Sequence, residues 1–242
     1  MATRMVNLVI DAERPSALAA FWADLLAWRI TADHPDEVAV EAPAADGCDL
    51  KFVFRPVSEP KIGKNRLHLD LASTSDRHQR ETVARAVSLG ARTIDIGQGD
   101  VPWTVLADPE GNEFCVLEPR ATYAASGAVA AIVVEAHHPG ALAGFWSPLI
   151  GWPITADEPA ITTLRNPAGR GPTLEFLRSD AQKHGKNRLH LDLAPHRDDD
   201  QAAESRRLRA AGARIVALGQ ADLPWTVLAD PEDNEFCLLA PR

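Results

Sequence analysis

A histidine and an aspartate stand two residues apart in the segment KNRLHLDLA, at residues 64–72, and the same nine letters return 122 positions later. In a strand, residues two apart share one face, so His68 and Asp70 would lie together, opposite the leucines. The second copy repeats the pair as His190 and Asp192. A carboxylate beside an imidazole can fix its tautomer, so each pair has the makings of a general base. The alternative is a structural histidine that is hydrogen-bonded to its neighbour or to backbone.

A second segment, EFCVLEP, adds further polar candidates by the same alternation. Glu113 and Cys115 fall on the face opposite Phe114 and Val116. A thiolate could bind zinc or act as a nucleophile, although most free cysteines in strands are buried apolar groups. The tryptophan of WTVLAD suits ligand stacking or core packing. The predicted cleft residues are His68, Asp70, Trp103, Glu113 and Cys115 in the first copy, and His190, Asp192, Trp225, Glu235 and Cys237 in the second.

These segments belong to a long internal repeat. Residues 101–120 match residues 223–242 at 16 of 20 positions, and the segment SALAAFWADLLAW near the start returns as GALAGFWSPLIGW. A period near 122 residues is too long for a solenoid, so it predicts two homologous domains. We place them at residues 1–120 and 128–242, joined by a short linker at 121–127.

Within each repeat, the periodicity predicts a strand, a helix and three more strands, twice over. An apolar run at residues 5–12 reads as a buried strand, and Pro15 follows at a helix start. Apolar residues at helical spacing then include Phe21 and Trp22, which we expect in the core. Pro148, inside the second copy of this helix, should kink or shorten it.

Composition excludes several classes of function. The formal net charge is −9, so we expect neither nucleic acid nor a membrane surface as a partner. No apolar run reaches a membrane span, and the amino terminus does not look like a signal peptide. Three cysteines without a C-x-x-C pair argue against a disulfide framework and favour the cytoplasm. The excess of Arg over Lys, 20 to 5, suggests a GC-rich bacterial source.

The order of these motifs resembles the vicinal oxygen chelate superfamily, which contains glyoxalase I, bleomycin-resistance proteins and extradiol dioxygenases. The resemblance rests on FW in the first helix, the histidine strand that opens the second module, and DPEGN before the last strand. It covers essentially the whole chain, and the fused pair is most similar to the glyoxalase-like domain subgroup. It implies an α+β fold of two tandem domains, each with two βαβββ modules whose curved mixed sheets surround a cleft. Whether modules pair within a repeat or across the two repeats stays open.

The resemblance also implies a metal site made of two histidines and a glutamate. The matching residues in the two copies are Asn7 and Ala131, His68 and His190, and Cys115 and Cys237. The ligand set is therefore broken in both copies, and we expect no cofactor. If a metal were bound, its ligands would be His68 and Glu113 in one copy, and His190 and Glu235 in the other.

Two classes of function remain. We expect a protein that binds a small organic molecule in a cleft of each domain, without the usual catalytic metal. The alternative is an enzyme, either a metal-assisted lyase or dioxygenase or a metal-free acid/base catalyst that uses His68 and His190. The chain could also form a homodimer, or carry one domain as a structural partner of the other.

Overall fold

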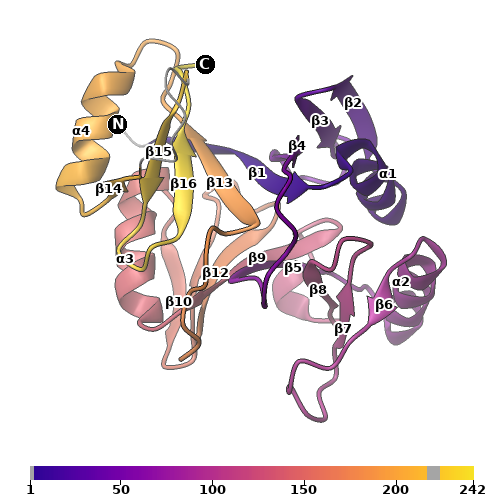
Figure 1. Ribbon diagram of the computed structural model, residues 1–242. Coiled ribbons are helices and arrows are strands. Elements are labelled where there is room, and N and C mark those ends of the chain that lie inside the picture. Colours follow the sequence, from indigo (N-terminus) through magenta and orange to yellow (C-terminus); the bar gives the residue numbers. More distant parts are fainter. Residues whose placement is uncertain (1–2, 217–223) are drawn as a thin grey trace.

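The computed structural model describes residues 3–216 and 224–242, which form four βαβββ modules in succession (Figure 1). The first module contains β1 (Arg4–Ala12), α1 (Pro15–Leu26), β2 (Arg29–His34), β3 (Glu37–Glu41) and β4 (Lys51–Pro56). The second contains β5 (Leu67–Leu71), α2 (Asp76–Ser88), β6 (Arg92–Thr93), β7 (Thr104–Ala107) and β8 (Glu113–Val116). The third contains β9 (Val129–Ala136), α3 (Pro139–Ile150), β10 (Ile154–Glu158), β11 (Ile161–Leu164) and β12 (Thr173–Arg178). The fourth contains β13 (Leu189–Ala194), α4 (Gln201–Ala210), β14 (Arg214–Ile215), β15 (Thr226–Ala229) and β16 (Glu235–Leu238).

The modules pair across the two sequence repeats. The first and fourth modules share one eight-stranded sheet, in the order β14-β15-β16-β13-β1-β4-β3-β2, which we call the outer sheet. The second and third share the other, in the order β10-β11-β12-β9-β5-β8-β7-β6, which we call the inner sheet. The joins are antiparallel, β1 with β13 and β5 with β9. Each sheet therefore takes one half from each repeat.

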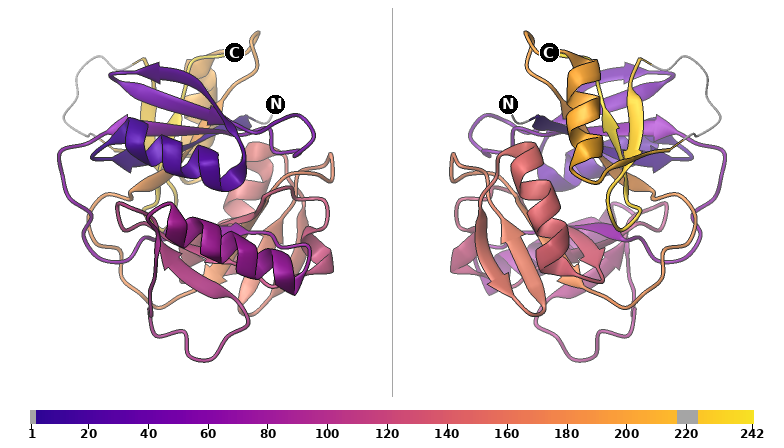
Figure 2. Two further views of the ribbon diagram at one scale, coloured as in Figure 1. Left: turned by 90° about the vertical axis from the view of Figure 1, so that its right-hand side faces the viewer. Right: turned by 90° about the vertical axis from the view of Figure 1, so that its left-hand side faces the viewer.

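One face of each sheet is covered by helices, and this face holds the core. Figure 2 shows α1 and α2 on one side of the molecule and α3 and α4 on the opposite side. Trp22 of α1 packs edge-on against Phe114 of β8, with ring centroids 5.1 Å apart, so the first helix also contacts the second module. Trp146 of α3 meets Phe236 of β16 in the same way at 5.0 Å. The prediction that these helical aromatics belong to the core is confirmed by their burial.

The two FW helices have the same length despite Pro148. Both α1 and α3 contain 12 residues, so the expected shortening of the second helix was wrong. Pro148 lies two residues before the end of α3, so only the end of the last turn follows the position where the backbone donor is lost. Gly151 then ends α3 with φ of 70°, a conformation that Ala27 adopts at the end of α1 with φ of 56°.

The opposite face of each sheet carries the repeated polar residues. Leu67, Leu69 and Leu71 of β5 belong to the main core, as alternation predicts, while His68 and Asp70 point away from it. The short linker forms a 3-10 turn, η1 (Ala121–Tyr123), before β9 begins. Among the described residues, no helix is long and apolar enough to cross a membrane.

Candidate functional site

Each sheet has a cleft on the face that lacks helices. The inner cleft, on the inner sheet, has a volume of about 310 Å³. The outer cleft, on the outer sheet, has a volume of about 710 Å³. Of the residues predicted from sequence, His68, Asp70, Trp103 and Cys115 line the inner cleft, and His190, Trp225, Glu235 and Cys237 line the outer one.

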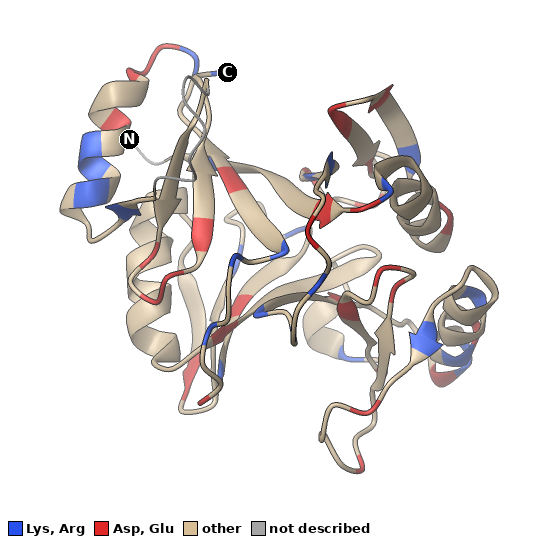
Figure 3. Ribbon diagram, in the orientation of Figure 1, with Lys and Arg blue, Asp and Glu red and all other residues tan. Residues whose placement is uncertain are grey.

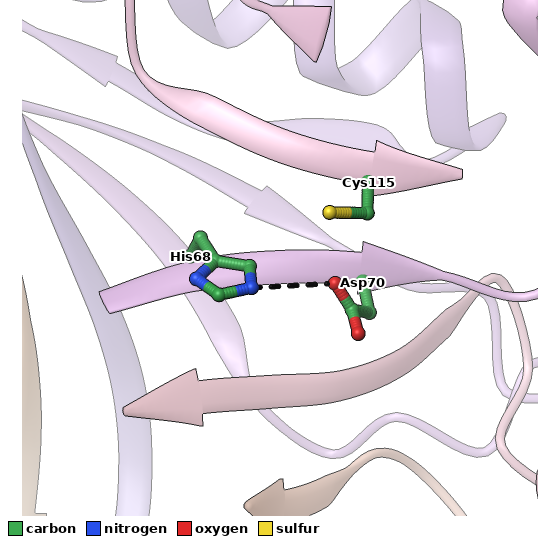
Figure 4. Close-up of side chains that lie close together, drawn as sticks. All are labelled: His68, Asp70 and Cys115. Carbon is green, nitrogen blue, oxygen red and sulfur yellow. Dashed lines mark ion pairs between the residues drawn. The ribbon is translucent and has the colours of Figure 1, made fainter. Parts of the chain in front are cut away.

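The structure brings a histidine, an aspartate and a cysteine together at the floor of each cleft. Asp70 lies opposite Cys115 where β5 pairs in parallel with β8, and His68 precedes Asp70 by two residues (Figure 4). The Nε2 atom of His68 is 3.5 Å from Oδ1 of Asp70, and one ligand atom from each of the three residues lies within 4.8 Å of the others. His190, Asp192 and Cys237 form the same group, with the corresponding distance at 3.7 Å.

Burial keeps the histidines of both groups in their neutral form and shifts the pKa of their neighbours. It lowers the pKa of His68 to about 4, with the nearby charge of Lys64 acting in the same direction. Burial likewise lowers the pKa of His190 to about 3. The pKa of Asp70 rises to about 7, through burial first and the neighbouring Glu175 second. Each imidazole is therefore neutral at pH 7 and can accept a proton or a hydrogen bond.

The cysteines lack the features of a nucleophile. Burial raises the pKa of the Cys115 thiol well above its ordinary value, and the adjacent carboxylate of Asp70 raises it further. Burial and Asp192 have the same effect on the pKa of Cys237. Both thiols are protonated at neutral pH, so thiolate attack on a ligand is disfavoured.

The glutamates of the last strands have other partners. Glu113 forms an ion pair with Lys61 at 2.9 Å, and its second oxygen accepts a hydrogen bond from the backbone N–H of Asn65 at 3.1 Å. Glu235 repeats both contacts with Lys183 and Asn187. These carboxylates therefore fix the loops that precede β5 and β13. They do not join the histidine groups.

The two tryptophans face the clefts, and each lies beside an arginine. The guanidinium carbon of Arg120 is 5.6 Å from the ring centroid of Trp103. That of Arg55 is 4.7 Å from the ring centroid of Trp225. Both rings are partly buried, and each packs on a small apolar cluster that includes the cleft cysteine. Each cleft thus combines an aromatic surface with polar groups.

Several cleft residues were missed by the sequence reasoning. Glu175, from β12, accepts a hydrogen bond from the Tyr123 hydroxyl at 2.9 Å inside the inner cleft. Glu135 of β9 pairs there with Lys64, and Asp11 of β1 pairs with Lys186 in the outer cleft. A charged residue within an apolar strand was the available signal for the three acids. Tyr123 could not have been found, because it lies in the expected linker.

The histidine, aspartate and cysteine groups have the donor chemistry of a zinc site. Nitrogen, oxygen and sulfur ligands suit zinc, and three protein donors would leave one position open. Oδ1 of Asp70 and Oδ1 of Asp192 are buried without a hydrogen-bond partner, and the ligand atoms of each group lie within 4.8 Å of one another. The residues therefore fit a divalent ion of this kind, which would supply Lewis acidity at the cleft floor. Binding would have to displace the thiol proton, so it would weaken as the pH falls.

Asn7, at the first position of the expected ligand set, contacts the group of the fourth module and not that of the second. Its side-chain Nδ2 donates to Oδ2 of Asp192 at 2.9 Å, so it holds the aspartate of the fourth module. Ala131, the corresponding residue of β9, has no such group and lies opposite Asp70. The first strands therefore contribute to each group from the other repeat.

Comparison with known proteins gives a consistent identification. The family model described as "Glyoxalase-like domain" matches residues 7–117 and again residues 131–239. Comparison with curated proteins gives no match. Among solved structures, glyoxalase I from Zea mays is similar with a TM-score of 0.69 and 13% identity, over 99% of this chain and 92% of that one. A putative dioxygenase from Bacillus subtilis subsp. subtilis str. 168 is similar with a TM-score of 0.64 and 12% identity, over 99% and 86%.

At such low identity, the solved structures establish a shared fold alone. The family match covers most of the chain and coincides with the two sequence repeats. The four βαβββ modules are those that the motifs led us to expect, and their pairing across the repeats settles what the sequence had left open. The chain therefore belongs to the glyoxalase-like domain family, within the vicinal oxygen chelate superfamily, and carries two copies of its domain.

Proposed function

We propose that the protein binds a small, ring-containing organic molecule in each of its two clefts. The observation that carries this proposal is the juxtaposition, within one cleft, of a tryptophan ring and a neutral buried histidine. The same juxtaposition occurs at Trp225 and His190. An apolar surface with a few convergent polar groups is typical of a small-molecule site.

The polar groups suit recognition more than covalent chemistry. The neutral imidazole can accept a hydrogen bond from a ring hydroxyl or amide, and the indole offers a face for stacking. The thiol stays protonated. Sequestration of the ligand therefore requires only what the described residues supply.

Tryptophan fluorescence tests this function. The purified protein would be titrated with a panel of phenols, quinones and aromatic acids, together with the variants Trp103→Phe and Trp225→Phe. Each variant removes the reporter from one cleft and leaves the core tryptophans in place. We expect saturable quenching in the wild type and weaker quenching in each variant. A panel that neither quenches fluorescence nor raises the melting temperature would overturn the proposal.

A metal-assisted enzyme is the second candidate, and the two histidine, aspartate and cysteine groups favour it. Metal analysis of the purified protein separates the two functions. Near one equivalent of zinc, nickel, iron or manganese per cleft, removable by a chelator with loss of turnover, would establish the enzyme. Ligand binding that is unchanged after chelation supports the metal-independent function. The variants His68→Ala and His190→Ala, followed by turnover, would reveal a metal-free acid/base catalyst.

A further inference from the structure

Each cleft has two walls: one has nearly the same residues in both clefts, and the other differs between them. The shared wall comes from the second and fourth modules, which carry the identical segment KNRLHLDLA. The other wall comes from the first and third modules, where equivalent positions follow from the pairing of β4 with β1 and of β12 with β9. Val53 in the outer sheet corresponds to Glu175, and Arg55 corresponds to Leu177. The outer cleft therefore has a cation at a position where the inner cleft has a leucine. The inner cleft has an acid at a position where the outer cleft has a valine.

Arg55 gives the outer cleft a guanidinium directly over its stacking surface. It lies 4.7 Å from the Trp225 ring centroid and lines the cleft. A guanidinium that stacks on an aromatic ring keeps its N–H groups in its own plane, where a carboxylate can accept two of them. Among the described residues, its one ion pair is with Glu37, at 3.5 Å, and the side chain of Glu37 is 44% exposed. An exposed, long pair of this kind is weak, so a ligand carboxylate can replace Glu37.

Among the described residues, the other cations near the outer cleft are already matched, and two further acids, Asp36 and Glu37, line it. Lys186 pairs with Asp11, and Lys183 pairs with Glu235. Asp192 is fully buried and accepts from Asn7. Arg55 is thus the cation that a ligand would meet beside Trp225.

The inner cleft has acids in the corresponding region. Glu175 is only 3% exposed, and its Oε1 accepts from the Tyr123 hydroxyl at 2.9 Å and from Thr173 Oγ1 at 2.8 Å. Its charge acts on Asp70 at the cleft floor. Arg120, beside Trp103, is paired with Glu118 at 2.7 Å. A carboxylate ligand would meet like charges here, which disfavours its binding.

Acidic and basic residues are interspersed over the described part of the chain, so neither half presents one uniform charge (Figure 3). Among the lining residues, the clefts differ in charge at Arg55, which corresponds to Leu177, and at Glu175, which corresponds to Val53. They also differ at Glu37 of the outer cleft, which corresponds to Ile161.

We propose that the two clefts select ligands of opposite charge. The outer cleft binds a planar ring that carries a carboxylate, with the carboxylate on Arg55 and the ring beside Trp225. The inner cleft rejects that ligand and accepts a ring that carries a protonated amine, which Glu175 attracts. This inference rests on the proposed function, because it assigns a ligand class to each of the same two clefts.

Two probes with one ring system and opposite charge test the inference, namely 2-naphthoate and 2-naphthylmethylamine. Fluorescence titration of the wild type, Trp103→Phe and Trp225→Phe assigns each probe to a cleft. Naphthoate is expected to lose its quenching signal in Trp225→Phe alone, and the amine in Trp103→Phe alone.

The chain supplies its own matched substitutions. Arg55→Leu installs the residue that the other copy carries, and it should weaken naphthoate binding by about 10- to 100-fold, the range expected for one charge-assisted bidentate contact. It should leave amine binding unchanged. Glu175→Gln keeps the shape of the side chain and should weaken amine binding alone. Leu177→Arg should give the inner cleft affinity for naphthoate, and this gain remains informative if Arg55→Leu fails to fold.

The outcomes distinguish this inference from the proposed function. Equal binding of naphthoate to both clefts, or its retention in Arg55→Leu together with no gain in Leu177→Arg, would overturn the charge selection while ring binding stands. Failure of both probes while other ring compounds bind would also overturn it. Failure of every ring compound would remove the proposed function itself.

Discussion

Glu232 should contribute strongly to stability, because it joins three modules at one buried point. Its carboxylate pairs with Arg66 of the second module at 3.1 Å. It also accepts hydrogen bonds from the backbone N–H groups of His137 and His138, at 2.7 and 2.9 Å, where α3 begins in the third module. The side chains of Arg66 and Glu232 are only 8% and 11% exposed. Glu110 makes the equivalent contacts with Arg188 and the start of α1.

The change Glu232→Ala should lower the free energy of unfolding by about 3 to 5 kcal/mol, the loss expected when one partner of a buried ion pair is removed. The guanidinium of Arg66 would keep its bond to the Glu135 carbonyl but lose its counter-ion, and two backbone donors would lose their acceptor. A domain is stable by only about 5 to 15 kcal/mol in total, so the effect should be large. Removal of both charges, in Arg66→Met with Glu232→Ala, should be less damaging because no buried charge is left alone.

Urea unfolding followed by circular dichroism measures these differences. Glu110→Ala should behave like Glu232→Ala, since the contacts are equivalent. Arg77→Ala is the control, because its pair with Glu81 on α2 is exposed, and it should cause no measurable change. A loss below about 1 kcal/mol for Glu232→Ala, or a double variant that is less stable than the single one, would refute the reasoning.

Three further predictions follow from burial and pairing. Burial raises the pKa of Cys48 to about 12 and protects all three thiols, so a disulfide reagent at pH 8 should react slowly with the folded protein and rapidly after denaturation; fast reaction of the native protein would contradict this. Burial raises the pKa of Asp108 from 3.8 to about 6, so between these pH values the folded state holds a proton that the unfolded state has lost. The wild type should therefore lose stability relative to Asp108→Asn as the pH rises from about 4 to about 6. Free energies of unfolding that change in parallel with pH for the two proteins would show that the shift is absent. A fragment of residues 1–120 leaves β1 and β5 without their partners β13 and β9. Because β13 is the copy of β5, β1 of one fragment should pair with β5 of a second, and light scattering should detect the dimer. A folded monomer would contradict this.

Alternation and repetition were enough to predict the modules. The face of β5 that carries His68 was predicted from period-two spacing alone, because leucines on one side and polar residues on the other leave a single register. The pairing of modules across repeats could not be predicted in this way. The strand at residues 5–12 and its copy are equally apolar, so either partner strand would bury them equally well.

The residues of the cleft were predictable only where the repeat marked them. The second and fourth modules share the segment KNRLHLDLA and most of their last two strands, and their histidines and cysteines stood out for that reason. Glu175 and Arg55 are the residues that differ between copies, so a search for repeated letters passes over them. Asp192 was predicted as a cleft residue, yet its side chain is fully buried and accepts a hydrogen bond from Asn7, a contact between distant strands that spacing cannot reveal.

The exchange of modules gives each cleft one wall from each repeat, and this has a consequence for divergence. The strands of the first module belong to the sheet of the outer cleft, whereas those of the second module of the same repeat belong to the sheet of the inner cleft. The two modules of one repeat can therefore change to suit different ligands, although they are adjacent in the sequence. The segment KNRLHLDLA and the last two strands, which the second and fourth modules share, preserve a common floor in both clefts. Differences between the first and third modules then change the charge of the opposite wall. The pairing of β1 with β13 and of β5 with β9 keeps the two walls of each cleft in register.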